Sequence, residues 1–178
     1  ILTEKKHPDE HAKLLVLQGS IYINMNSRFV DAYHNLDKAV NLIKKADSAF
    51  IGLAYNNIAL IWLYLSDWEN ATEYIKKAEN TFDDSGYTRS AFFVRSNSYI
   101  IHVGNGIFKS ILPSLENDLN YAVNINDTTS ALFLYVTLGN GYITEKMLDE
   151  AYKCLLEAEH VVEKYSKPLP FRKADIYY

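Results

Sequence analysis

The stretch LGNGYITEKMLDEAYKCLLEA, residues 138–158, has counterparts earlier in the same chain. Two columns of equivalent residues step by 40 throughout: Tyr22, Trp62, His102 and Tyr142, and Gly19, Ala59, Tyr99 and Gly139. A third column consists of Ala32, Ala71, Ile111 and Ala151, and its first step is 39. The first unit therefore carries one extra residue, which we expect in the turn 25–28. Self-similarity at a fixed period of this length indicates a stacked array of repeats.

Each unit reads as a helical hairpin, because two amphipathic stretches with apolar residues three and four apart flank a short polar turn. In the second unit we expect Ser66 and Glu69 to form a capping box that starts a helix at about Asp67, running towards Phe82. Pro8 fits the first position of a helix, and Pro113 is expected close to the start of another. The repeats are predicted at about 8–46, 48–84, 87–125 and 127–166, with a partial fifth at 170–178, in a single array over 1–178.

The composition agrees with an all-α fold of helices long enough to bury a continuous core. Of 178 residues, 48% are hydrophobic, while only 7 are Gly and 4 are Pro. The formal net charge of −4 disfavours nucleic acid, which attracts an excess of Lys and Arg. The longest apolar run, 58–65, is much shorter than the roughly 20 residues of a membrane span. The single cysteine, Cys154, has no disulfide partner and is expected to be a buried, inert thiol.

Small residues in fixed columns predict close packing between the helices. Gly19, Ala59 and Gly139, together with the alanines of the third column, are expected to leave room for the large side chains of Tyr22, Trp62 or Tyr142. One hairpin cannot bury both apolar faces, so each hairpin should pack on the next and build a superhelix with one concave wall. The chain begins at Ile1 and shows no signal peptide, so we expect a fragment of a longer protein whose compartment the sequence does not indicate.

These residues resemble the signature of the tetratricopeptide repeat family. The fourth unit carries it in Leu138, Gly139, Tyr142, Leu148, Ala151, Leu155 and Ala158. The first and second units match at the equivalent positions, whereas the third has Tyr99, His102 and Asp118 at signature positions. The resemblance implies a right-handed superhelix of antiparallel helical hairpins, four complete and a fifth begun. The period of 40 exceeds the family's usual 34 and is similar to the repeats of kinesin light chains and of bacterial peptide-sensing and transcriptional regulators.

In such repeats the first helix of each hairpin lines the concave wall, which predicts the residues that face a ligand. By register these are Val16, Ser20, Leu53, Asn56, Leu60, Leu63, Phe93, Ser96, Ile100, Phe133, Val136 and Asn140. A mostly apolar wall favours a peptide that inserts apolar side chains, with Asn56, Ser96 and Asn140 available to its backbone. Lys13 and Lys173 are too few cations for the family's carboxylate clamp. Alternatively, the same stripe is core, or a helix from elsewhere in a longer protein covers it.

No catalytic motif is present, so we expect a protein that is not an enzyme and binds neither metal nor cofactor. His7 and His11 are spaced as metal ligands, but Pro8 makes His7 a residue flanking the helix. The resemblance implies a peptide- or protein-binding module, the sensing or scaffolding region of a larger transcriptional regulator or histidine kinase. Such a region would be cytoplasmic, or periplasmic in a membrane-bound regulator. The alternative is the repeat region of a peptide-controlled phosphatase or other enzyme assembly; recognition of single-stranded RNA would need a basic wall.

Overall fold

The computed structural model of the protein describes residues 7–25, 28–42, 48–81 and 89–165. These residues form eight helices and no strand, which confirms the all-α prediction for this part of the chain. The helices are α1 (Pro8–Asn24), α2 (Phe29–Leu42), α3 (Ser48–Tyr64), α4 (Trp68–Asn80), α5 (Arg89–Gly104), α6 (Phe108–Asn124), α7 (Thr128–Thr144) and α8 (Leu148–Tyr165). The predicted extra residue at 25–28 and the predicted fifth repeat at 170–178 fall partly or wholly outside the described residues.

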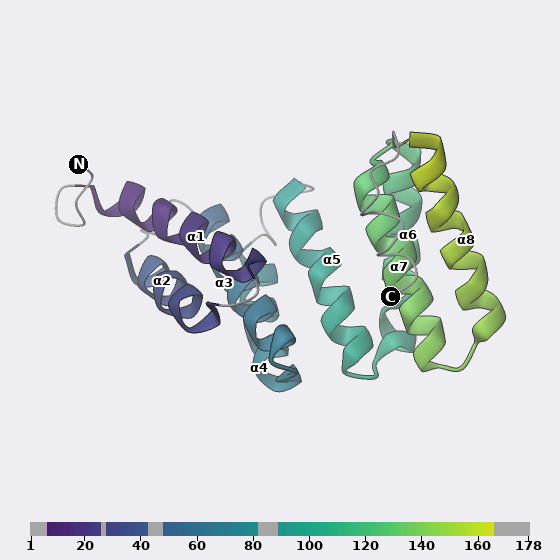
Figure 1. Ribbon diagram of the computed structural model, residues 1–178, viewed down its shortest axis with the longest axis horizontal. Coiled ribbons are helices and arrows are strands. Elements are labelled where there is room, and N and C mark those ends of the chain that lie inside the picture. Colours follow the sequence, from purple (N-terminus) through teal and green to yellow (C-terminus); the bar gives the residue numbers. More distant parts are fainter. Residues whose placement is uncertain (1–6, 26–27, 43–47, 82–88, 166–178) are drawn as a thin grey trace. The chain divides into compact units, whose positions relative to one another are not determined.

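The chain forms two compact units, and the division falls inside α5. Unit 1 is Ile1–Ile101 and unit 2 is His102–Tyr178. In unit 1, α1 packs on α2, α3 packs on α4, and α3 also contacts both α1 and α2 (Figure 1). In unit 2, α7 packs on α8 on one side and on α6 on the other. Within each of these groups, helices that are consecutive in sequence are in contact, as hairpins require.

The 40-residue period reappears in the backbone at the turns inside hairpins. Ser66, Gly106 and Lys146 all have positive φ, of 58°, 75° and 61°. Each follows a first helix and donates its N–H to the carbonyl three residues earlier, and the next residue donates to the carbonyl five residues earlier. This is the Schellman arrangement that ends a helix and satisfies its last carbonyls. The carbonyls accepting the second bond belong to Trp62, His102 and Tyr142, one of the columns that define the repeat.

The turn before α4 differs from the predicted capping box. Ser66 cannot be the N-cap, because its left-handed backbone already ends α3. The N-cap is Asp67, whose carboxylate accepts hydrogen bonds from the Asn70 N–H at 3.1 Å and from Asn70 Nδ2 at 2.8 Å. The pKa of Asp67 is lowered, first by the bond from the Asn70 side chain and then by the backbone bond. One residue therefore belongs to the end of α3 and the next begins α4.

The prediction for Pro113 was wrong in position. Helix α6 begins at Phe108, so Pro113 lies within the helix, beyond the first turn. At that depth a missing N–H removes an internal backbone hydrogen bond. Pro8, by contrast, is the first residue of α1, as predicted, and His7 before it occupies the N-cap position without a side-chain cap bond.

The second helices bury the columns of small and branched residues on which the repeat was recognised. Ala32, Ala71 and Ala151 are at most 3% exposed. Leu36, Ile75 and Leu115 are fully buried, as are Ala39, Ala78 and Ala158. The third unit has Ile111 and Asp118 where the other units have alanine, and these two side chains are only half-buried. The alanines of the second helices thus have equivalent burial in every unit that keeps them, whereas Leu155 is half-buried where Leu36 and Leu115 are fully buried.

The glycines of the first helices make room for leucines and not for the aromatic column. A Cβ added at Gly19 would lie 2.7 Å from Leu36 Cγ. A Cβ added at Gly139 would meet Leu155 Cδ2 at 3.4 Å, an acceptable contact. The predicted pairing of these glycines with Tyr22 and Tyr142 is therefore corrected: the small residue lies opposite the second helix of its own hairpin. The bulky aromatics contact other elements, described below.

None of the helices in the described ranges is long and apolar enough to span a bilayer.

Candidate functional site

The predicted ligand-facing wall divides into buried and accessible positions in unit 1. Val16, Asn56 and Ser96, which share one column on α1, α3 and α5, are 2%, 0% and 4% exposed. These three side chains lie in the packing between helices. A ligand reaching them would have to separate the helices, so the accessible wall is narrower than the predicted set.

A polar seam accounts for this burial. Asn97 on α5 donates its Nδ2 to Asn56 Oδ1 on α3 at 2.9 Å, and both side chains are buried. Asn57 on α3 donates to Ser20 Oγ on α1 at 2.7 Å, and Ser20 in turn donates to the Val16 carbonyl at 3.0 Å. The amide of Asn56 is left with a buried Nδ2 that has no partner. These hydrogen bonds join α1 to α3 and α3 to α5, with donors at equivalent positions, Asn57 and Asn97, and acceptors at different ones.

Two of the three polar groups that were expected to bind a peptide backbone, Asn56 and Ser96, are engaged within unit 1. Ser96 Oγ also bonds internally, to the Phe92 carbonyl at 2.8 Å. Asn57 and Asn97 were absent from the predicted site, although they stand 40 residues apart in the sequence. Asparagines recurring at the repeat period on neighbouring helices are a signal of an interhelical hydrogen bond that sequence reasoning could have used.

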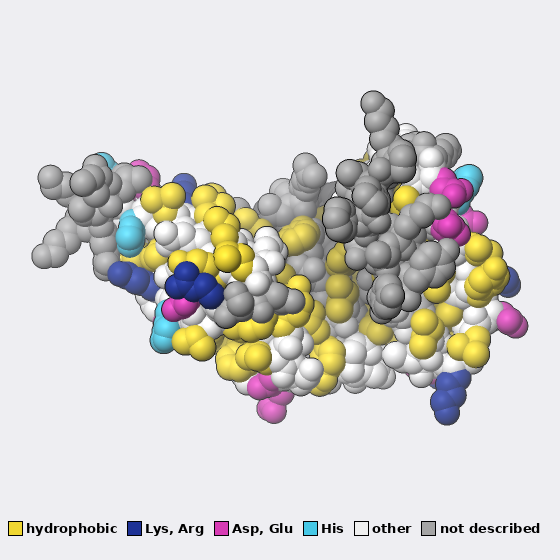
Figure 2. Space-filling view, viewed as in Figure 1, with side chains coloured by type: hydrophobic (Ala, Val, Ile, Leu, Met, Phe, Trp, Pro, Cys, Tyr) yellow, Lys and Arg dark blue, Asp and Glu magenta, His cyan; other side chains and the backbone are white. Residues whose placement is uncertain are grey.

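The remaining wall positions in unit 1 are apolar and accessible. Leu53, Leu60 and Leu63 on α3 and Ile100 on α5 are half-buried. Phe93 on α5 is 48% exposed, although it is a large aromatic side chain. Leu53 and Phe93 are equivalent positions, as are Leu60 and Ile100, so the two helices present the same two rows of apolar groups. Hydrophobic side chains occupy much of the visible surface over α1 to α4, with Lys, Arg, Asp and Glu side chains scattered among them (Figure 2).

The other predicted wall residues belong to unit 2 and are described separately. Phe133 and Val136 on α7 are half-buried, and Asn140 is exposed. The structure therefore brings together the predicted residues of α1, α3 and α5, and places those of α7 in the other compact unit.

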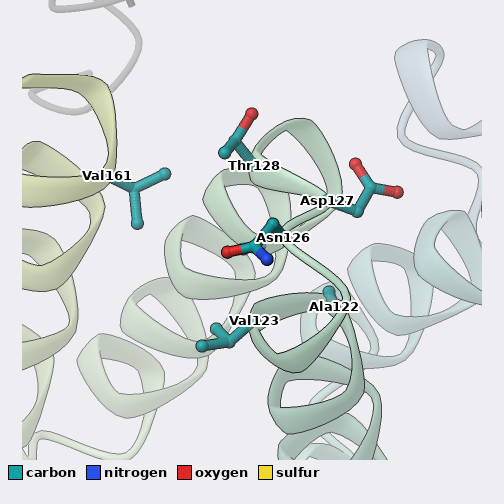
Figure 3. A pocket seen from close by; sticks show the side chains of 7 residues that line it. Ala122, Val123, Asn126, Asp127, Thr128 and Val161 are labelled. Atoms are coloured by element: carbon teal, nitrogen blue, oxygen red, sulfur yellow. The ribbon is translucent and has the colours of Figure 1, made fainter. Parts of the chain in front are cut away.

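A shallow hollow in unit 2 offers no chemistry. It lies between the α6–α7 turn and α8 and is lined by Ala122, Val123, Asn126, Asp127, Thr128, Ala131 and Val161 (Figure 3). Its one carboxylate, Asp127, points away from Val161 in this view and caps α7. It accepts bonds from the N–H and the hydroxyl of Ser130 at 3.2 and 2.7 Å. A side chain occupied in this way is a structural cap.

The pKa values of Cys154 and Tyr142, elsewhere in unit 2, are shifted in the direction that lowers the reactivity of these groups. Burial, aided by Glu116 and Glu157, raises the pKa of the Cys154 thiol to about 11. The thiolate is the nucleophilic form, so Cys154 has little of it at neutral pH. Burial also raises the pKa of Tyr142. In the ranges for which side chains are described, no three His, Cys, Asp or Glu residues are grouped closely enough to hold a metal ion.

No protein-family model matches the chain, and a search of curated proteins also returns no match. The resemblance to tetratricopeptide repeats thus rests on the residues themselves.

Proposed function

We propose that this chain is a non-catalytic binding module, a tetratricopeptide-like right-handed array, that takes a peptide or protein segment on the first helices of unit 1. The observation that carries the proposal is the accessible apolar surface of Leu53, Leu60 and Leu63 on α3 and Phe93 and Ile100 on α5. Exposed apolar groups gathered over adjacent helices are typical of interaction surfaces. We further propose that the module serves a larger regulatory protein as its sensing or scaffolding region.

The chemistry of this surface favours a particular kind of partner. The side chains are aliphatic and aromatic, and the polar groups close to them are engaged in the seam between helices. Two parallel rows of apolar positions, one on α3 and one on α5, suit a peptide that presents apolar side chains at regular spacing, in helical or extended form. Recognition would depend on apolar contact more than on hydrogen bonds to the wall.

The proposal is tested with displayed random 12-residue peptides, followed by fluorescence anisotropy of an enriched peptide. The decisive variant combines Leu60→Asp and Phe93→Asp, which place two charges on the wall of unit 1 at side chains that are already accessible. We expect the affinity to fall at least about tenfold, roughly 1.4 kcal/mol, with helicity by circular dichroism unchanged.

The matched control is Phe133→Asp, which makes the same change at an equivalent position of unit 2 and should leave the affinity unaltered. Failure to enrich any apolar peptide, or equal binding by the double variant, would refute a binding surface on unit 1. If Phe133→Asp abolished binding and the double variant did not, the binding surface would lie on α7.

A further inference from the structure

Helix α8 exposes a side chain at a position that is buried one repeat earlier. Leu148 is 66% exposed, whereas its equivalent on α6, Phe108, is 1% exposed. Phe108 is covered by the first helix of the next hairpin: its ring meets that of Tyr142 on α7 edge-on, with the centroids 5.2 Å apart. Leu148 occupies the position of a side chain that a following hairpin would cover.

A second position on α8 repeats this relation. Tyr152 is 64% exposed, and its equivalent on α2 is Tyr33. Tyr33 is half-buried and meets the ring of Trp62, on the first helix of the next hairpin, at 5.9 Å. Hydrophobic side chains are visible over α8 in Figure 2. The outer face of α8 therefore has the features with which α2 and α6 receive the next hairpin.

Helix α1, the first helix of the first repeat, also exposes apolar side chains at positions that are mostly buried in later repeats. Leu14, Leu17 and Ile21 lie on one face of the helix and are 44%, 55% and 56% exposed. The equivalents of Leu14 in later first helices are Ala54, Val94 and Leu134, and all three are buried. The equivalents of Ile21 are Ile61, Ile101 and Gly141, which are buried too. Of the equivalents of Leu17, Asn97 and Thr137 are buried. Gly141 faces the Phe108 ring, so this face of a first helix is the one that contacts the preceding hairpin.

The register of the repeat indicates what would cover α8. Trp62 and Tyr142, which cover the preceding second helices, share one column of the repeat. The same column begins with Tyr22, which lies beside Ile21 on α1. We propose that α1 of a second copy of this chain packs on α8, so that the chains associate head to tail through the same contact that joins α2 to α3 and α6 to α7. Such an interface joins the α1 face of one chain to the α8 face of another. The resulting dimer still has one free α1 face and one free α8 face, so association can continue beyond the dimer.

The test uses the whole chain and two double variants at exposed positions. Leu17→Glu with Ile21→Glu blocks the α1 face, and Leu148→Glu with Tyr152→Glu blocks the α8 face. Sedimentation equilibrium of the unaltered chain should show a mass rising above 20.4 kDa at about 100 μM, a range that populates complexes of micromolar affinity. Each variant alone should be monomeric and as helical as the parent.

Mixing the two variants distinguishes head-to-tail contact from other dimers. One variant keeps its α8 face and the other its α1 face, so an equimolar mixture should form a 1:1 dimer that does not grow further. A parent chain that stays monomeric overturns the proposal, and so does a mixture that stays monomeric. A variant that dimerises on its own would indicate pairing of like faces and would overturn it as well. If one double variant loses helicity, Tyr152→Glu or Leu17→Glu alone takes its place. The candidate wall uses other residues, so this result is independent of peptide binding.

Discussion

At the scale of single residues, glycines of the first helices differ in the space around the missing Cβ. Gly19 lies against Leu36, at a distance that leaves no room for a methyl group, and Gly139 lies against Leu155 with room for one. Gly141 faces the Phe108 ring even more closely than Gly19 faces Leu36. The space around the missing Cβ, and not helix propensity, decides what an alanine would do at each position.

We expect Gly139→Ala to stabilise the protein by up to about 1 kcal/mol, because alanine is the better helix former and the added methyl fits. Gly19→Ala and Gly141→Ala should destabilise it by about 1–3 kcal/mol, since the methyl forces a packed side chain aside. Urea denaturation followed by circular dichroism gives the three free energies of unfolding. Equal effects at Gly19 and Gly139 would show that Leu36 moves away without cost.

At the scale of elements, three residues separate the first helix from the second in the α3–α4, α5–α6 and α7–α8 hairpins. Ser66 takes the left-handed conformation that closes α3, and Asp67 then caps α4. The same backbone conformation recurs at Gly106 and Lys146, only one of which is a glycine. The turn is therefore imposed by the hydrogen bonds of the two helices as much as by the residue in it.

The Asp67 cap should make stability depend on pH. Its pKa is lowered in the folded protein from an ordinary 3.8, so its contribution is complete above about pH 3.8 and is lost as the pH falls through the lower folded value. We expect the melting temperature of the parent, minus that of Asp67→Asn, to be constant near neutral pH and to decrease in acid. Asparagine also caps helices but does not titrate. A difference that is the same at pH 3 and pH 7 would contradict a charged cap.

At the scale of the whole molecule, hairpins are joined by aromatic side chains between a second helix and the next first helix. Trp62 on α3 meets Tyr33 on α2, and Phe108 on α6 meets Tyr142 on α7. In an array whose hairpins contact only their neighbours, stability depends on these junctions as well as on the hairpins.

Trp62→Ala should cost about 3 kcal/mol, because it empties the junction between the first two hairpins. Trp62→Phe should cost less, since a ring remains and the buried indole N–H, which has no partner, is removed. The comparison is Tyr152→Ala, whose ring is 64% exposed and which should change stability by less than about 0.5 kcal/mol in dilute solution. Chemical denaturation measures all three, and a loss below about 1 kcal/mol for Trp62→Ala would mean that the junction is unimportant.

Local patterns in the sequence determined the helices, the turns inside the hairpins and the burial of the alanine column. Each depends on residues a few positions apart, or on the same residue returning every 40 positions. Tertiary structure alone decided that Val16, Asn56 and Ser96 lie in a seam between helices and that Gly19 faces Leu36. The reason is that the rotation of a helix about its axis is set by all of its neighbours together, and a turn of one position moves a side chain from an open wall into a packed seam.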